Sequence, residues 1–306
     1  MASGSPPAES LPPFPRDRRR SDSHNQGQCQ GRPPAPGRFD LGPSSSAPLD
    51  KVLWGLQVPL HITHVSQPTT PPFITSVPRF GYLALLLSRL AAYYGVDSPC
   101  SSFHHEGVQL RNLAVGLLVD LYQPPLPWRL TVGDGPEWDI GDTFMNSAKE
   151  ADYIRNGNAK RIMSLSKDHT TQLWNSVQDN DYASFSKINK HLLSTPVPIK
   201  NIPLRIYLPS TPDPRASTAS NGQSSGSFKV IQTLVPPTLP RSNTLQTLGS
   251  VLKTILPTLF PDSQRPLLAD VVAHGSAVPF KAPLKELMEE AAYPDGWLAL
   301  VVVLVQ

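Results

Sequence analysis

Two stretches in which apolar and polar residues alternate constrain the fold of this 306-residue chain most strongly. They are Leu56–Ile62 and Ile202–Leu208. Because successive side chains of a β-strand point to opposite faces, each stretch predicts a strand with one face buried. Pro59 lacks a backbone N–H, which predicts that the first strand lies at a sheet edge or contains a bulge. The fold must therefore contain two half-buried strands that are far apart in sequence.

A similar order of elements follows each stretch. After the first we expect a short strand through Ile74 and Val77, an apolar run at helical spacing from Tyr82 to Tyr94 that ends at Gly95, and three strand-like segments at 103–110, 115–121 and 128–132. After the second we expect strands at 228–235, 270–274 and 297–305, and helices at 245–256 and 284–291. Periodicity alone predicts a mixed α and β chain.

Residues 139 to 195, between these halves, have helical patterns. The clearest helix runs from Phe144 to Arg155, with Asp142 as its predicted N-cap and Asn156-Gly157 as its left-handed end. At about 100° per residue one side of this helix is apolar, formed by Phe144, Met145, Ala148 and Ala151. Lys149 lies about 110° from the centre of that stripe. We therefore expect Lys149 to be exposed at the rim of the helix.

Further helical segments and two unstructured segments are expected from composition. The helical segments are Ala159–Leu165, one capped by Asp168 that runs through Val177, and one capped by Asp181 that ends near Leu193. Residues 1 to 50 mix Pro, Ser, Gly and charge without apolar periodicity, so they cannot bury enough surface to offset the entropy of ordering. We predict disorder there, and a flexible loop at 209–227, which is rich in Ser, Thr, Pro and Gly.

The block Phe144–Asp152, which reads Phe-Met-Asn-Ser-Ala-Lys-Glu-Ala-Asp, resembles the modification site of the autophagy protein 5 family. Other short words of that family occur in its order from about Val52 to the C-terminus. They are Tyr82–Leu86, Glu106-Gly107, Gly116–Leu118 with Asp120, Leu126–Trp128, Gln172–Trp174, Asn201–Tyr207, Leu245–Gly249, His274-Gly275 and Tyr293–Asp295. The chain departs from the family pattern at Asn112–Ala114 and at Ser186. These departures concern local packing or a partner contact, and neither touches Lys149.

The resemblance implies an α+β fold in which two ubiquitin-like β-grasp domains flank a helix-rich domain. On this basis we expect a disordered tail at 1–50, a first ubiquitin-like domain at 51–136, a helix-rich domain at 137–197 and a second ubiquitin-like domain at 198–306. A hairpin, a helix and further strand-like segments around each alternating stretch agree with the order of a β-grasp.

The resemblance also implies a function. In the family, the lysine of the Lys-Glu-Ala-Asp word, here Lys149, forms an isopeptide bond with the C-terminal glycine of the ubiquitin-like autophagy protein 12. Activating (E1-like) and conjugating (E2-like) enzymes carry out this step, and the coiled-coil autophagy protein 16 binds non-covalently. The conjugate is expected to act, through the phosphatidylethanolamine-conjugating E2, as a ligase-like (E3-like) platform for the lipidation of autophagy protein 8 during autophagosome formation. The implied location is cytoplasmic, and peripheral at the membrane of the pre-autophagosomal structure.

The residues themselves indicate no catalytic group, metal site or cofactor site. Cys29 and Cys100 are too few for a disulfide framework or a four-ligand zinc site, and favour a reducing, intracellular setting. The neighbouring His104 and His105 would point to opposite faces of a strand, so we expect no metal there. A net charge of +3 gives no argument for nucleic acid. Leu298–Val305 is too short to cross a bilayer, and contact with a membrane surface stays open.

The leading hypothesis is an acceptor protein that is not itself an enzyme. The chain ends in Val305-Gln306 rather than the glycine through which ubiquitin-like modifiers are activated. A free lysine has a pKa of about 10.4, so the conjugating enzyme must deprotonate and position Lys149. The alternative is a ubiquitin-like-fold adaptor that binds its partners non-covalently, with Lys149 an ordinary surface residue. A hydrolase is a third hypothesis, for which no motif supplies a nucleophile.

Overall fold

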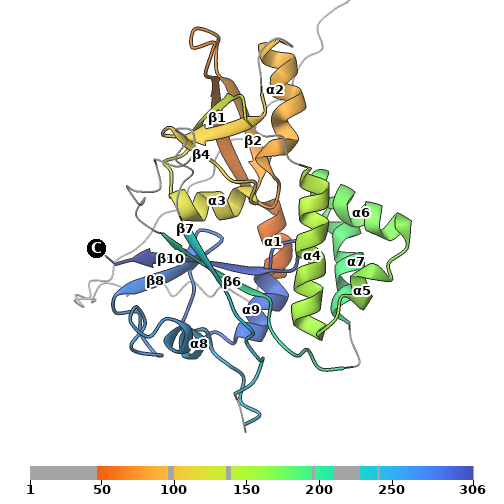
Figure 1. The fold of residues 1–306 in the computed structure, drawn as a ribbon, viewed down its shortest axis with the longest axis vertical. Helices are drawn as coiled ribbons and strands as arrows, with labels where there is room; N and C mark the ends of the chain where they lie inside the picture. The colour runs from red at the N-terminus through yellow and green to blue at the C-terminus, as the bar shows by residue number, and fades with distance from the viewer. Residues whose placement is uncertain are drawn as a thin grey trace, which may run out of the picture. The chain divides into compact units, whose positions relative to one another are not determined.

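The structure is a computed structural model that describes residues 47–95, 100–135, 139–194, 197–209, 228–239 and 242–305. The predicted tail lies outside these residues up to position 46, and the predicted loop lies outside them from position 210 onward. The chain from Ser46 onward forms one compact unit that contains both ubiquitin-like domains and the helix-rich domain, which lies between them in sequence and beside them in space (Figure 1).

The first ubiquitin-like domain follows helix α1 (Leu49–Gly55). Its strands are β1 (Gln57–His64), β2 (Phe73–Pro78), β3 (Ser102–His105), β4 (Val108–Gln109) and β5 (Trp128–Gly133). A 3-10 helix, η1 (Leu83–Leu86), continues into α2 (Leu87–Tyr94), and α3 (Val115–Tyr122) precedes β5. Helix α2 ends at Gly95 as predicted.

The second ubiquitin-like domain repeats this plan. Its strands are β6 (Leu204–Pro209), β7 (Phe228–Gln232), β8 (Ala269–Ala273), β9 (Ser276–Ala277) and β10 (Leu298–Leu304), and its helices are α8 (Leu248–Ile255) and α9 (Leu284–Ala291). The strand order is β7-β6-β10-β8-β9 here and β2-β1-β5-β3-β4 in the first domain. In each sheet the strand that comes first in sequence pairs in parallel with the strand that comes last, β1 with β5 and β6 with β10. All the other neighbouring strands are antiparallel. This is the β-grasp order, which confirms the predicted fold class.

Two expectations for the first domain are wrong. The segment Val115–Leu121 was predicted as a strand but forms helix α3, because a short apolar run has no periodicity that separates a strand from a buried helix. Pro59 does not mark an edge, since β1 lies between β2 and β5. The pairing of β1 with β5 begins at Leu60, one residue beyond Pro59, so the missing N–H falls outside that ladder.

The helix-rich domain consists of α4 (Ile140–Asn156), α5 (Lys160–Met163), α6 (Lys167–Gln178) and α7 (Tyr182–Leu193). Asp181 caps α7 and Gly157 ends α4 with a φ of 75°, both as predicted. The other two predicted caps are wrong. Asp139 caps α4 and Ser166 caps α6, whereas Asp142 and Asp168 lie in the first turns, where a carboxylate is favoured by the helix dipole without acting as the cap.

Among the described residues, three apolar cores hold these parts together. Each ubiquitin-like domain has its own core between sheet and helices. The third is shared by all parts, since it joins Trp54 and Leu117 of the N-terminal half, Phe144 and Leu173 of the helices, and Val301 of β10. Burial of apolar surface in this shared core binds the domains into one unit.

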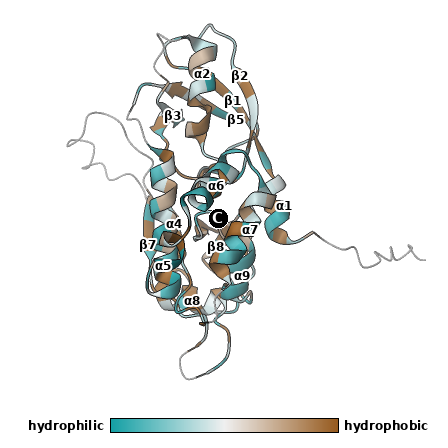
Figure 2. Cartoon of the chain, turned by 90° about the vertical axis from the view of Figure 1, so that its right-hand side faces the viewer, coloured by the Kyte–Doolittle hydropathy of each residue, from teal (hydrophilic) through white to brown (hydrophobic). Residues whose placement is uncertain are grey.

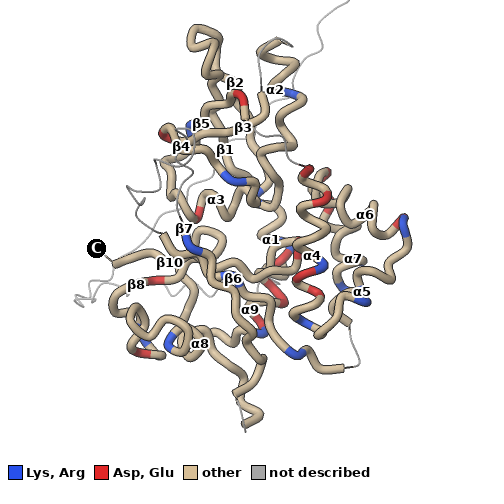
Figure 3. Tube along the Cα trace, viewed as in Figure 1, with Lys and Arg blue, Asp and Glu red and all other residues tan. Residues whose placement is uncertain are grey.

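The surface elements are polar and carry both signs of charge. Helix α6 consists mostly of hydrophilic residues and α9 shows a hydrophilic side (Figure 2), and acidic and basic residues are interspersed along α4 (Figure 3). No helix in the described ranges has the length and apolarity that a membrane crossing requires.

A buried ion pair marks the contact between the two ubiquitin-like domains. Arg79, which follows β2, pairs with Asp120 of α3, and their side chains are only 8% and 2% exposed. The Asp120 carboxylate also accepts backbone hydrogen bonds from His274 and Gly275, in the turn between β8 and β9. His274 and Gly275 both have positive φ, which aims these N–H groups at Asp120. The turn of the second domain is thus held by a carboxylate of the first.

His274 lies in this contact as a neutral side chain. Its Nε2 is 2.8 Å from the carbonyl oxygen of Ala291, and its ring packs against Phe80 and Tyr293. Burial, together with the nearby Arg79 charge, lowers the pKa of His274 to about 4. Protonation of this ring would place a second cation beside Arg79.

Replacing Arg79 with Met should lower the free energy of unfolding by about 3–5 kcal/mol, because the Asp120 carboxylate stays buried without its cation. Urea denaturation measures this loss. Lys285→Met is the control, since Lys285 forms an exposed pair with Glu289 at 3.7 Å and its loss should cost less than about 0.5 kcal/mol. Equal losses in the two variants would contradict a role for the buried pair.

Acidification should weaken the fold through His274. Because the pKa of His274 is lower in the folded state than its ordinary value of about 6.5, the unfolded chain takes up the proton first. The contribution of the neutral His274 ring to the free energy of unfolding is complete above about pH 6.5, and it decreases by up to about 3 kcal/mol as the pH falls to about 4. Denaturation curves across this range should show a shallower pH dependence for His274→Asn, since Asn tolerates positive φ and does not titrate. An unchanged slope would exclude His274 as the source.

Candidate acceptor site

Lys149 lies on the exposed side of α4, as its spacing predicted. Its Nζ atom is 3.5 Å from Oδ1 of Asn146, one turn earlier on the same helix. Within the described part of the chain, no carboxylate or imidazole forms an ion pair or hydrogen bond with it. The site therefore presents a primary amine to solvent, and the described residues around it provide no base to remove its proton.

The opposite side of α4 is fixed in the shared core. Phe144, Ala148 and Ala151 are buried there, and the ring of Phe144 lies 5.2 Å from that of Trp174 on α6. Met145, also predicted on this side, is partly buried. Because three successive turns of the helix are anchored, the backbone beneath Lys149 is held by packing.

Asp152, the last residue of the Lys-Glu-Ala-Asp word, has a structural role. It is buried, and its carboxylate accepts hydrogen bonds from Nδ2 of Asn156 at 2.7 Å and from the backbone N–H of Ile162 at 3.2 Å. The second bond ties the start of α5 to α4. Asp152 thus stabilises the chain that follows the acceptor helix and does not face Lys149.

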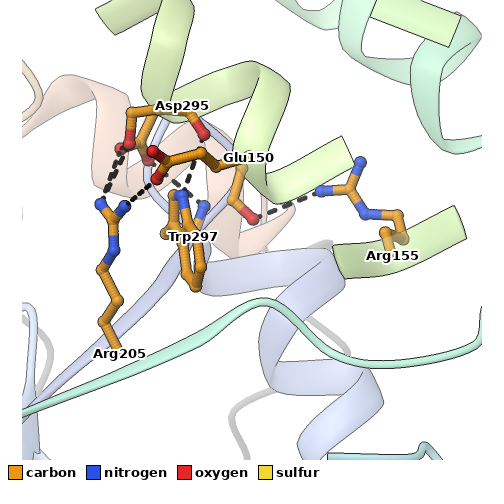
Figure 4. Close-up of polar contacts among 7 residues, drawn as sticks. Glu150, Arg155, Arg205, Asp295 and Trp297 are labelled. Atoms are coloured by element: carbon orange, nitrogen blue, oxygen red, sulfur yellow. Dashed lines mark hydrogen bonds and ion pairs between the residues drawn. The ribbon is translucent and has the colours of Figure 1, made fainter. Parts of the chain in front are cut away.

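Arg205 of β6 connects α4 to the second ubiquitin-like domain (Figure 4). Its guanidinium donates to Oε2 of Glu150 at 2.9 Å and to Oγ of Ser147 at 3.0 Å. It also lies 3.9 Å from Oδ2 of Asp295 and 3.8 Å from the centre of the Trp297 ring. The side chain is only 16% exposed, so these contacts are partly shielded from water.

The loop Tyr293–Trp297 contacts the same helix. Ser147 donates its hydroxyl hydrogen to Oδ2 of Asp295 at 2.7 Å, and Trp297 donates from Nε1 to the backbone carbonyl of Ser147 at 3.0 Å. Arg155 donates to the carbonyl of Gly296 at 3.3 Å. A Cβ atom at Gly296 would lie 2.9 Å from a guanidinium nitrogen of Arg155 and 3.2 Å from the Cβ of Ala151, and the φ of Gly296 is +84°, so this position favours glycine. We call Arg205, Asp295 and Trp297 the clamp.

Burial dominates the electrostatics around the clamp. It raises the pKa of Asp295, an effect that the Ser147 hydroxyl and the Arg205 charge oppose. Burial lowers the pKa of Arg155, and the nearby Asp152 charge opposes this decrease. The clamp is thus a partly buried network in which each charge depends on its partners.

Sequence reasoning missed the clamp as a functional unit. Arg205 occupies a polar position of the alternating stretch Ile202–Leu208, which predicts exposure to solvent, but α4 and Trp297 cover that face of β6. Arg205 and Asp295 did lie within words shared with the autophagy protein 5 family, and this was the available signal.

The departure at Asn112–Ala114 adjoins the clamp. These three residues line a cavity of about 80 Å³ together with Thr143, Ser147, Arg205 and Tyr293, among others. The second departure, Ser186, is half-buried on α7. The first departure therefore lies at a half-open cavity at the junction of the three domains, close to the acceptor helix.

The described residues contain no cluster of three or more His, Cys, Asp or Glu side chains that could hold a metal ion. His105 has Nδ1 3.3 Å from the carbonyl of Arg129, within its own sheet. Burial raises the pKa of the Cys100 thiol, which is the opposite of what an activated nucleophile needs. Cys29 lies outside the described residues.

Comparison with known proteins identifies all three domains. Residues 53–133 match the family model described as Autophagy protein ATG5, UblA domain; residues 138–195 match its alpha-helical bundle region and residues 201–302 its UblB domain. The chain is 66% identical over 269 residues to Autophagy protein 5 of Chaetomium globosum, covering 88% of this chain and 94% of that protein. It is also 66% identical to Autophagy-related protein 5 of Neurospora crassa, over 84% of this chain and 71% of that protein.

The crystal structure of Kluyveromyces marxianus Atg5 has the same fold. It superimposes with a TM-score of 0.64 at 22% sequence identity, over 83% of this chain and 98% of that chain. Since three adjoining family models and relatives of high identity cover the described domains in the same order, the chain belongs to the autophagy protein 5 family.

Proposed function

We propose that Lys149 is the acceptor for the C-terminal glycine of autophagy protein 12. The observation that carries this proposal is the exposed amine of Lys149 on a helix that is anchored on its other sides, within the family's Lys-Glu-Ala-Asp word. The neutral amine attacks the thioester that joins autophagy protein 12 to its E2-like enzyme. The isopeptide C–N bond forms, the C–S bond breaks, and the enzyme's cysteine leaves as the thiol or thiolate. The proton of the amine goes to a base that the conjugating enzyme supplies.

Membership of the autophagy protein 5 family assigns the chain to autophagy. Beyond that, we propose that the conjugate binds the coiled-coil autophagy protein 16 and acts as an E3-like platform. Its task is to promote transfer of autophagy protein 8 from the phosphatidylethanolamine-conjugating E2 to the lipid. The protein works by bringing partners together, in the cytoplasm and peripherally at the membrane of the pre-autophagosomal structure. Two ubiquitin-like domains fixed against one helical domain offer a rigid surface for such positioning.

Lys149→Arg should abolish conjugation and leave the fold intact. Arginine keeps the positive charge but stays protonated at neutral pH, so it cannot attack the thioester. Because the side chain is exposed, the free energy of unfolding should stay within about 0.5 kcal/mol of wild type. The measurement is incubation with autophagy protein 12, its E1-like and E2-like enzymes and ATP, followed by mass spectrometry of the isopeptide.

Lys160→Arg is the matched control, since Lys160 is also exposed and begins the neighbouring helix α5. It should conjugate like wild type, at Lys149. Normal conjugation of Lys149→Arg would refute the site. No conjugate on wild type, with all enzymes shown to be active, would instead favour the non-covalent adaptor.

A further inference from the structure

We infer that Arg205, Asp295 and Trp297, the clamp of the second ubiquitin-like domain, are positioning residues for conjugation at Lys149. This inference rests on the proposed function. It assigns to the second domain a part in the acceptor reaction, although none of the three residues touches the lysine amine.

The contacts of the clamp converge on one turn of α4. Arg205 binds Ser147 and Glu150, Asp295 binds Ser147, and Trp297 binds the backbone carbonyl of Ser147. Lys149 lies between these two helix positions. The clamp therefore fixes the axial position and the rotation of the turn that carries the acceptor.

Apolar packing is incomplete next to this turn. The cavity of about 80 Å³ is lined by Thr143, Phe144 and Ser147 on the side of α4 and by Arg205 and Trp297 on the side of the second domain. A cavity removes van der Waals contacts from the atoms that line it. At this cavity, between α4 and the second domain, the directional contacts of the clamp supplement the apolar packing of the shared core.

Arg205 also controls the carboxylate beside the acceptor. Glu150, the next residue after Lys149, is 61% exposed, and its carboxylate is held toward β6 by Arg205 (Figure 4). Among the described residues, the hydrogen-bond partner of the Lys149 ammonium is therefore the amide oxygen of Asn146 and not Glu150. Loss of Arg205 would free the Glu150 side chain from this position on the acceptor turn.

Position matters for this reaction because the conjugating enzyme must place a thioester within about 3–3.5 Å of the amine. A misplacement of about 1 Å can slow such a step by about a hundredfold. If the acceptor turn shifts or rotates, the enzyme can still bind the protein but reaches the productive geometry less often. The clamp should therefore affect the chemical step more than binding.

The test measures single-turnover transfer of autophagy protein 12 from the loaded E2-like enzyme to an excess of acceptor, over a range of acceptor concentrations. Arg205→Met removes the charged contacts, and Trp297→Phe removes the Nε1 donor and part of the ring volume while keeping an aromatic ring. We expect the maximal transfer rate to fall at least about tenfold in Arg205→Met and less in Trp297→Phe, with an unchanged half-saturating concentration. Arg205→Lys keeps the charge without the two-pronged geometry and should recover part of the loss.

Arg161→Met is the matched control. Arg161 donates to the carbonyls of His191, Leu192 and Ser194 at the end of α7, so it loses a comparable set of hydrogen bonds away from the acceptor turn. Thermal unfolding is recorded for every variant, and rates are compared below the onset of unfolding. Hydrogen exchange should show faster exchange around Ser147 to Ala151 in Arg205→Met and not in Arg161→Met.

Wild-type rates in folded Arg205→Met and Trp297→Phe would overturn the inference while the acceptor role stands. So would an equal loss of rate in Arg161→Met, because the effect would then follow stability alone. If Arg205→Met does not fold, the maximal transfer rates of Trp297→Phe and Arg205→Lys test the inference instead, and wild-type rates in both would overturn it. Absence of any conjugate on wild type would overturn the proposed function and the inference together.

Discussion

Both faces of the sheet in the second ubiquitin-like domain are covered, and the arrangement of the other domains depends on this. Along β10, Leu298, Leu300 and Val302 face the domain's own core, whereas Ala299 and Val301 face the shared core. A sheet that is apolar on both faces needs a layer on each. Its own helices form one layer, and the helix-rich domain with α1 and α3 forms the other. This explains why the C-terminal run is apolar without interruption.

Apolar burial drives this association but has no direction, so polar contacts must select one arrangement. Arg79 and Asp120 reach the turn at His274, which fixes the two ubiquitin-like domains to each other. Arg205 and the loop at Asp295 fix the acceptor helix to the second domain. Each network is partly or fully buried, and a buried polar group left without a partner costs about 1–3 kcal/mol or more if charged. Any other packing of the same apolar surfaces would leave these groups unsatisfied, so it is disfavoured.

Sequence periodicity predicted the strands that carry alternating residues, such as β1 and β6, and the family words supplied the β-grasp order. Sequence patterns gave wrong predictions where a short stretch of residues is compatible with two local structures. The run Val115–Leu121 is apolar except at Asp120 and is too short to show a clear period, so only its packing between the domains distinguishes helix α3 from a strand. The first carboxylate inside a helix was mistaken for its cap at Asp142 and Asp168, since both residue positions favour acidic groups. The exposure of Lys149 followed from helical spacing, but Arg205 did not reveal its partners, because contacts between distant segments leave no periodic trace.

A lysine alone has no chemical feature that distinguishes it from other surface lysines, and the described surroundings of Lys149 add no base. What distinguishes it is the rigidity of its support. A helix held by Phe144 and Ala151 in the core and by Arg205 at its flank presents its amine in a narrow range of positions. An enzyme that carries its own base and thioester needs only this from an acceptor, because the entropy of aligning the two reactants is then reduced before they meet. The division of work follows: the chain supplies a fixed nucleophile, and the partner supplies proton transfer and bond activation.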